Sequence, residues 1–266
     1  MPEGPEVRRE ADMISKALSG EVATSIWAEY PDLNKKLSQL CGKRVKRVFS
    51  LGKALIIEFP GPRYIYSHNQ LYGKWFVVSE GESIETNRRL RLSLVTSTHQ
   101  ALLYSASMIE LLDTKQFKDH SYLKSLGLNV LDPKVTKKAI EKRLKESRFR
   151  GRQLSSLYLD QKFLAGIGNY LRSEILFFSG VREYKTPNEL DERTIKKLAK
   201  NSLSVARRSY KSNGSTLTTS LAKSSRATSR FSVFARAGKQ CLLCNSKIKK
   251  SYINSRRLYF CPSCQR

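Results

Sequence analysis

The sequence predicts an α+β protein of two domains: an N-terminal antiparallel β-sandwich with a flanking helix, followed by a helical domain that ends in a cysteine-rich segment. Three observations lead to this fold class. The hydrophobic pattern changes from short strand-like runs to a helical period near residue 130. The charge balance changes at the same place, and four of the five cysteines lie after residue 240.

The first domain should begin with a helix over residues 5–19, because Val7, Ala11, Ile14 and Leu18 recur at helical spacing. Short runs rich in β-branched and aromatic residues follow, each bounded by Gly, Pro or polar residues. They lie at residues 45–49, 54–59, 75–78 and 90–95. Such runs favour an antiparallel sandwich or barrel.

A domain boundary is expected near residues 127–133, where turn residues cluster. We therefore predict a first domain over 1–127, a linker over 128–134, a helical domain over 135–230 and a cysteine-rich segment over 231–266. Helical runs are expected at 154–163, 170–178 and 189–209. Residues 211–230 are rich in Ser, Thr and basic side chains, which favours a mobile loop that closes over a nucleic acid.

The chain of 266 residues carries a formal net charge of +26, which favours a polyanionic partner. Residues 131–266 hold 31 Lys and Arg against 9 Asp and Glu, so most of the excess lies there. A ribosomal or membrane-surface protein could share this sign of charge. We find no basic amphipathic segment, signal-peptide core or membrane-spanning run, and expect a cytoplasmic protein with no membrane partner.

Four cysteines form two close pairs, Cys241 with Cys244 and Cys261 with Cys264, separated by 16 residues. This spacing is typical of a structural zinc site with four thiolate ligands and no open position for catalysis. Four unliganded thiols are the alternative. The residues between the pairs suit a β-hairpin, whose turn carries Arg256; that guanidinium could hold a phosphate or be a solvated turn charge.

The opening run places Pro2 directly before Glu3. After removal of the initiator methionine, the Pro2 nitrogen would be a free secondary amine beside a carboxylate. Such an amine can attack C1′ of a deoxyribose and form an iminium ion, which acidifies the C2′ hydrogens. The alternative is a rigid N-terminal tail, since each proline fixes a backbone dihedral.

Three further segments could contact nucleic acid. The glycines of 164–170 precede a helix and could bind a phosphate, with Asn169 as an added donor, or could form a tight turn. Gln70, Leu71 and Tyr72 could enter a duplex at a loop tip, or Leu71 could point inward from a strand end. Lys53 could contact phosphate, act as an acid, or be a turn lysine.

Together these pieces resemble the formamidopyrimidine-DNA glycosylase and endonuclease VIII family, most closely bacterial-type endonuclease VIII. The resemblance runs from Met1 to Arg266 and is carried by six separated segments. These are residues 1–6, 52–55, 66–73, 103–107, 164–172 and the two cysteine pairs.

The resemblance implies a β-sandwich followed by a helix-two-turns-helix domain with a zinc finger, which together bind damaged double-stranded DNA. It implies a bifunctional glycosylase and abasic-site lyase of base-excision repair that acts by β,δ-elimination. Its implied site residues are Pro2 as Schiff-base nucleophile, Glu3 as acid/base, Lys53 and Arg256 in elimination, Asn169 and Arg256 on phosphates, and Gln70, Leu71 and Tyr72 in the duplex. The implied metal is one structural Zn²⁺, and none is required for the chemistry.

Two positions depart from the family pattern. Ser125 stands where relatives commonly carry a DNA-contacting arginine, and Asn129 replaces an aspartate after the linker glycine. The Gln-Leu-Tyr triplet is similar to that of enzymes acting on oxidised pyrimidines, so we expect these lesions. The alternatives are a preference for oxidised purines, such as 8-oxoguanine and formamidopyrimidine, and a non-catalytic protein that binds damaged DNA. A monomer associated with the nucleoid is the simplest expectation.

Overall fold

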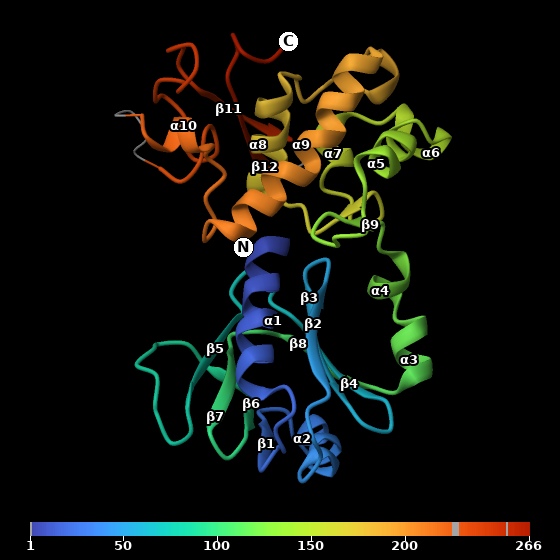
Figure 1. Cartoon of the computed structure of the whole chain (residues 1–266), viewed down its shortest axis with the longest axis vertical. Helices are drawn as coiled ribbons and strands as arrows, with labels where there is room; N and C mark the ends of the chain where they lie inside the picture. The colour runs from blue at the N-terminus through green and yellow to red at the C-terminus, as the bar shows by residue number, and fades with distance from the viewer. Residues whose placement is uncertain (1, 225–228, 254) are drawn as a thin grey trace. The chain divides into compact units, whose positions relative to one another are not determined.

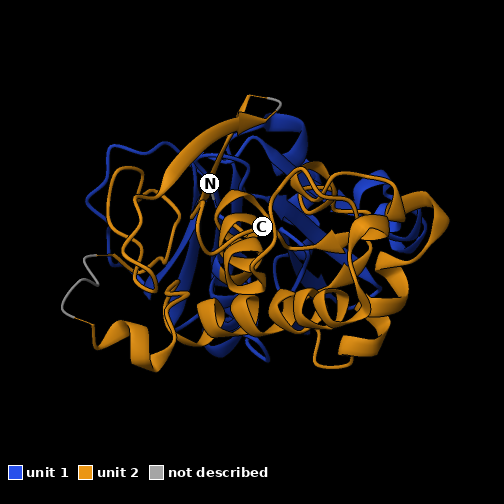
Figure 2. Ribbon diagram, turned by 90° about the horizontal axis from the view of Figure 1, so that it is seen from above, with its two compact units in different colours: residues 1–2, 6–125 blue, residues 3–5, 126–266 orange. Residues whose placement is uncertain are grey.

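The computed structural model describes residues 2–224, 229–253 and 255–266, and divides the chain into two compact units. The first comprises residues 6–125 with the N-terminal two residues; the second comprises residues 3–5 and 126–266 (Figure 2). The division therefore falls between Ser125 and Leu126, and the short segment Glu3–Pro5 belongs with the second unit.

The first unit contains two four-stranded antiparallel sheets (Figure 1). Their strand orders are β1-β6-β7-β5 and β2-β3-β4-β8. The strands are β1 Ser25–Ala28, β2 Arg47–Leu51, β3 Ala54–Phe59, β4 Arg63–His68, β5 Lys74–Ser79, β6 Leu90–Val95, β7 His99–Tyr104 and β8 Met108–Leu112. The helices are α1 Gly4–Leu18, α2 Pro31–Leu37, α3 Thr114–Asp119 and α4 Ser121–Ser125, with a 3₁₀ turn η1 at Ser38–Leu40.

One hydrophobic core joins the two sheets and α1, as the sandwich prediction requires. Val7, Ala11, Ile14 and Leu18 of α1 are almost fully buried in it, together with Trp75 of one sheet. Strand β3 is buried along its whole length because its second face packs against α3 and α4. The expected helix and the four strand-like runs are all found, with ends that differ by at most two residues.

The second unit is largely helical. Its helices are α5 Lys137–Leu144, α6 Ser147–Arg150, α7 Leu154–Leu157, α8 Asn169–Ser179, α9 Glu192–Lys211 and α10 Thr219–Ala222, with a 3₁₀ turn η2 at Pro187–Glu189. Strands β9 Leu128–Asn129 and β10 Leu164–Ala165 form a short parallel pair, and β11 Lys249–Ile253 pairs with β12 Arg256–Phe260 as an antiparallel hairpin. Leu258 and Phe260 of the hairpin join the helical core.

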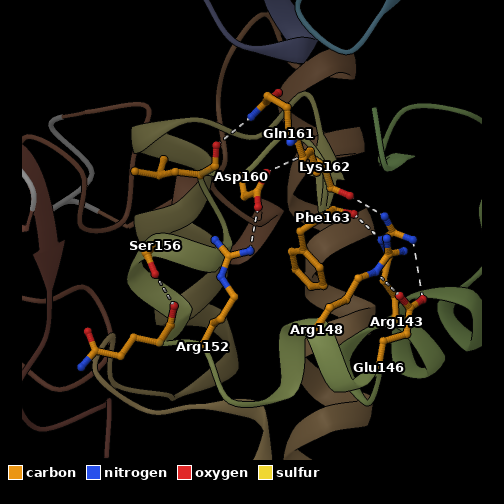
Figure 3. A network of polar contacts seen from close by, with 11 residues as sticks. Arg143, Glu146, Arg148, Arg152, Ser156, Asp160, Gln161, Lys162 and Phe163 are labelled. Atoms are coloured by element: carbon orange, nitrogen blue, oxygen red, sulfur yellow. Dashed lines mark hydrogen bonds and ion pairs between the residues drawn. The ribbon is translucent and has the colours of Figure 1, made fainter. Parts of the chain in front are cut away.

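The helix expected over residues 154–163 is wrong in its second half, since α7 ends at Leu157. The Asp160 side chain accepts a hydrogen bond from the Lys162 backbone at 2.9 Å, and Arg143 donates to the carbonyl oxygens of Lys162 and Phe163 (Figure 3). A side chain that bonds its own backbone two residues on stabilises a turn in place of the helical bond.

The loop expected over residues 211–230 is partly structured. Its residues 219–222 form α10, and Leu217 and Leu221 are buried with Leu242. Residues 225–228, in the Ser- and Thr-rich part of that segment, lie outside the described residues. The helix expected from residue 189 begins at Glu192, because the Asp191 side chain caps the Thr194 N–H at 2.7 Å.

Candidate functional site

The carboxylate of Glu3 lies at the N-terminus of α8. Its two oxygens accept backbone hydrogen bonds from Gly168 at 2.7 Å, Tyr170 at 2.8 Å and Leu171 at 3.2 Å. The side chain is 2 % exposed. Free N–H groups and the helix dipole make a helix N-terminus a site for negative charge, so these three donors stabilise the ionised carboxylate.

Glycines make this approach of two distant segments possible. The Gly4 N–H donates to the Gly166 carbonyl at 2.7 Å, and a side-chain carbon at Gly4 would lie 2.9 Å from the Gly166 Cα. Gly166 has a φ of +95°, and a side-chain carbon at Gly168 would lie 2.5 Å from the Glu3 carboxyl carbon. Larger residues at Gly4 or Gly168 would therefore push Glu3 out of its position.

These contacts correct one expectation. The glycine segment before α8 was predicted to bind a phosphate of the nucleic acid through its backbone N–H groups, or to form a tight turn. The N–H groups of Gly168, Tyr170 and Leu171 instead donate to Glu3, and that of Gly166 donates to Gln161.

Asn169 is oriented by Arg172, a residue that sequence reasoning missed. The Arg172 guanidinium is fully buried and donates to Asn169 Oδ1 at 3.3 Å, to the Ser155 carbonyl at 2.7 Å and to the Arg257 carbonyl at 3.0 Å. Burial lowers the pKa of Arg172 to about 10, while the charge of Glu3 opposes this shift. By holding Oδ1, Arg172 leaves the Asn169 amide hydrogens available to an acceptor.

Arg256 opens strand β12 of the hairpin, opposite Ile253. Its side chain is exposed, and its charge adds to the lowering of the Arg172 pKa. The neighbouring Ser255 has a φ of 61°, which marks the tight turn, while Asn254 lies outside the described residues. Arg172, on the same helix as Asn169, thus joins that helix to the hairpin that bears Arg256.

The four paired cysteines come together beside this hairpin. Their sulfur atoms all lie within 4.8 Å of one another, and two of the distances are 3.8 Å, Cys241 to Cys264, and 3.4 Å, Cys244 to Cys261. A tetrahedral Zn²⁺ with bonds of about 2.3 Å to sulfur needs sulfur atoms about 3.8 Å apart. The four thiols therefore fit such an ion, while the fifth cysteine, Cys41, is a separate exposed residue.

Lys53 follows Gly52 in the turn between β2 and β3, and is only 7 % exposed. Its backbone N–H donates to the Tyr122 hydroxyl at 3.0 Å. Burial, with the charge of Lys53 nearby, lowers the pKa of His68 to about 4. His68 is therefore neutral at physiological pH, and its Nδ1 accepts the Gln70 N–H at 3.0 Å, as a hydrogen-bonded structural residue would.

Gln70, Leu71 and Tyr72 form the exposed turn between β4 and β5. Leu71 is 53 % exposed and Tyr72 is 71 % exposed. The Gln70 side chain accepts a hydrogen bond from the Ser107 hydroxyl at 2.8 Å, which fixes one side of the turn. Of the two interpretations of Leu71, the structure has the exposed one, because this residue points to solvent and not into the core.

Ser125 and Asn129, the two departures from the family pattern, have local partners. The Ser125 hydroxyl donates to the Tyr122 carbonyl at 2.9 Å, and Asn129 Oδ1 accepts the Leu131 N–H at 3.2 Å.

Sequence reasoning also missed Glu174. This buried carboxylate accepts the Thr216 hydroxyl at 2.6 Å and the N–H groups of Ser232, Val233 and Phe234 at 2.8–2.9 Å. It thereby ties α8 to the chain that leads into the cysteine-rich segment. The signal for both Arg172 and Glu174 was a charged residue inside the apolar run of a helix.

Models of two protein domains of one family match most of the chain. The formamidopyrimidine-DNA glycosylase N-terminal domain matches residues 1–118, and the formamidopyrimidine-DNA glycosylase H2TH domain matches residues 126–221. The chain belongs to the formamidopyrimidine-DNA glycosylase family. This membership confirms the predicted fold class and resemblance.

Curated relatives support the same family assignment. The chain is 44% identical over 265 residues to Endonuclease 8 of Escherichia coli (strain K12 / DH10B) and to Endonuclease 8 of Shigella flexneri, with 100% of each chain covered. It is similar in fold to solved structures of Lactococcus lactis Fpg. One is a complex with DNA containing an abasic site, with a TM-score of 0.82, 24% identity and 99% of each chain covered.

The family and these relatives make the chain a bifunctional DNA glycosylase and abasic-site lyase of base-excision repair. No helix among the described residues is both long and apolar enough to cross a membrane.

Proposed function

We propose that this glycosylase excises oxidised pyrimidines through a Schiff base on the Pro2 nitrogen and then cleaves the strand by β,δ-elimination. The observation that carries the proposal is the position of Glu3, the residue directly after Pro2. Three backbone donors hold its carboxylate at the N-terminus of α8, so the charge that would assist the neighbouring amine is fixed by one helix.

In the first step, the Pro2 nitrogen bonds to C1′ and the bond from C1′ to the base breaks. The base leaves with a proton, and the amine loses one. The bond from C1′ to the ring oxygen O4′ then breaks, O4′ takes a proton, and the nitrogen lone pair forms the C=N bond of the iminium ion. The ionised Glu3 stabilises the positive charge that develops on the sugar and nitrogen, and moves protons between them. Loss of a C2′ proton then expels the 3′ phosphate, and a second elimination expels the 5′ phosphate.

Lys53 and Arg256 supply positive charge for these eliminations. The Lys53 side chain is buried, and would bind one phosphate and transfer a proton in the β step. Arg256, exposed at the start of β12, would hold a flanking phosphate with Asn169 and assist the δ step. Ser125 would add a weaker contact where relatives commonly carry arginine.

Gln70, Leu71 and Tyr72 would fill the space that an extruded nucleotide leaves in the duplex. Their exposure at the end of a tight turn supports this role. An apolar side chain and an aromatic ring at such a tip can replace the lost stacking, which offsets part of the cost of extrusion.

One structural Zn²⁺ would be held by Cys241, Cys244, Cys261 and Cys264, and would keep the hairpin that presents Arg256 folded. With four protein ligands it takes no part in the chemistry. The partner is damaged double-stranded DNA in the nucleoid of the cytoplasm, and we propose that one chain acts as a monomer.

Duplexes that carry one defined lesion test the substrate class. Thymine glycol, 5-hydroxycytosine and dihydrouracil should each be excised faster than 8-oxoguanine opposite cytosine. Equal or faster excision of 8-oxoguanine would assign the enzyme to oxidised purines. Tight binding of every duplex with no excision, and with Met1 shown to be absent, would favour the non-catalytic alternative.

A further inference from the structure

The turn that carries Gln70, Leu71 and Tyr72 is constrained where it joins its two strands. The Gly73 N–H donates to the Asn69 carbonyl at 2.7 Å, and Gln70 has a φ of 48°. A side-chain carbon at Gly73 would lie 2.7 Å from the Asn69 Cα and carbonyl oxygen. The backbone therefore closes tightly at Asn69 and Gly73, and the position of the tip depends on what holds Asn69.

Glu10 of α1 is hydrogen-bonded to the chain on both sides of this turn. Asn69 Nδ2 donates to Glu10 Oε2 at 2.6 Å, and the backbone of Trp75 also hydrogen-bonds the Glu10 carboxyl group. Asn69 precedes the tip and Trp75 follows it, so one carboxyl group joins the two strands where the turn leaves β4 and enters β5. Asn69 itself is 3 % exposed.

The Asn69 side chain has little else to fix it. Its Oδ1 atom is buried and has no hydrogen-bond partner among the described residues. An unpaired buried amide oxygen destabilises this side-chain position, so the contact with Glu10 must offset that cost. Removing the carboxyl group would leave both polar atoms of the Asn69 side chain without a hydrogen-bond partner among the described residues, and Asn69 would be free to turn.

We propose that Glu10 is a positioning residue for base excision, which holds the tip residues Gln70, Leu71 and Tyr72 in place through its bonds to Asn69 and Trp75. The inference rests on the proposed void-filling role of that tip. Glu10 does not itself touch DNA in this account; it acts on the turn, and its effect should appear only with substrates that need the turn.

Three variants of α1 test the inference. Glu10→Ala removes both bonds, Glu10→Gln keeps a carbonyl acceptor in the same place, and Asp12→Ala removes a carboxylate that pairs with Arg8 on the same helix. Backbone hydrogen exchange over residues 69–75 reports the turn directly. Exchange should quicken at least tenfold in Glu10→Ala, and remain near that of the parent protein in Glu10→Gln and Asp12→Ala.

Activity is measured on two substrates. Excision of dihydrouracil from a duplex needs the tip, whereas strand cleavage at an abasic site in single-stranded DNA leaves no void to fill. Glu10→Ala should lower kcat for the duplex about tenfold and leave single-strand cleavage within twofold, and Glu10→Gln should restore the duplex rate. Equal losses on both substrates, or no rescue by Gln, would overturn the positioning role.

Leu71→Ala separates failure of this inference from failure of the proposed tip function. If Leu71→Ala leaves duplex excision unchanged, the void-filling role is wrong. Unchanged backbone hydrogen exchange over residues 69–75 in Glu10→Ala would independently refute the proposal that Glu10 fixes the turn. If Leu71→Ala slows duplex excision, the double variant with Glu10→Ala should excise the lesion at nearly the same rate as Leu71→Ala alone. Both substitutions act through the same turn. Fully additive losses would contradict the coupling.

Discussion

The backbone N–H of Gly168 donates a hydrogen bond to the Glu3 carboxylate at 2.7 Å, across 165 residues of sequence. This contact places the residue after Pro2 on the first turn of α8. A helix can fix a carboxylate more precisely than a free N-terminal tail can, because its donors do not reorganise during the reaction.

Gly168→Ala should therefore impair catalysis. The new methyl group would lie 2.5 Å from the Glu3 carboxyl carbon, so the carboxylate would have to move. A displacement of about 1 Å at a reacting group can cost about 10²-fold in rate, and we expect a fall of this size in kcat for dihydrouracil excision. Gly151→Ala is the matched control, since nothing lies within 4 Å of its added carbon. Similar rates for both variants would refute the role given to Glu3.

Arg256→Ala should weaken DNA binding to about the same degree for every sequence, because a phosphate contact reads no bases. The slope of log Kd against log salt concentration should fall by about 1 as one phosphate contact is lost. Arg257→Ala removes the same charge from the next position of the hairpin and serves as the control. If Arg257→Ala changes the slope as much as Arg256→Ala does, the clamp is not specific to Arg256.

Chelation of the metal should unfold the hairpin and abolish strand cleavage. Metal binding supplies folding free energy to small sites of this kind, and β11 and β12 lie between the two cysteine pairs. Hydrogen exchange should quicken over residues 249–260, while β2, β3 and β4 of the first unit keep their protection. Full cleavage by protein with verified metal loss would contradict the structural role.

Glu10 gives the first unit a pH-dependent stability. Burial raises the pKa of Glu10 from 4.5 to about 7, an effect opposed by the hydrogen bonds from Asn69 and Trp75; Glu6 raises it further and Lys74 lowers it. A raised carboxyl pKa contributes stability that is present below pH 4.5 and is lost as pH rises through 7. The free energy of unfolding lost in this way is about 3 kcal/mol at most.

Glu10→Gln should remove that dependence, because the amide does not ionise. Unfolding of the first unit, followed at pH 5, 6, 7 and 8 by the fluorescence of Trp27 and Trp75, which both lie in it, should show the parent protein losing stability relative to Glu10→Gln as pH rises. A constant difference between the two proteins from pH 5 to 8 would show that Glu10 does not titrate in this range.

Much of the fold could be predicted because it depends on local pattern. The period of Val7, Ala11, Ile14 and Leu18 gave α1, and the cysteine spacing gave the cluster and its hairpin. The turn at Asp160 could not be foreseen, since it depends on Arg143 reaching two distant carbonyl groups.

The site was only partly predictable for the same reason. Pro2 and Asn169 could be singled out as residue types suited to the chemistry, but their supports come from elsewhere in the sequence. No local pattern shows that Glu3 takes the donors of α8, that Arg172 orients Asn169, or that Glu10 bonds Asn69. Each contact joins residues whose side chains meet only after packing, except the helical pair of Arg172 and Asn169.

The most direct test of the account is covalent capture at Pro2. Protein whose N-terminus is verified as Pro2 is mixed with DNA that carries one abasic site, borohydride is added, and the adduct is mapped by mass spectrometry. The account predicts a deoxyribose remnant on the Pro2 nitrogen. No adduct at Pro2, with DNA binding intact, would contradict the Schiff-base mechanism.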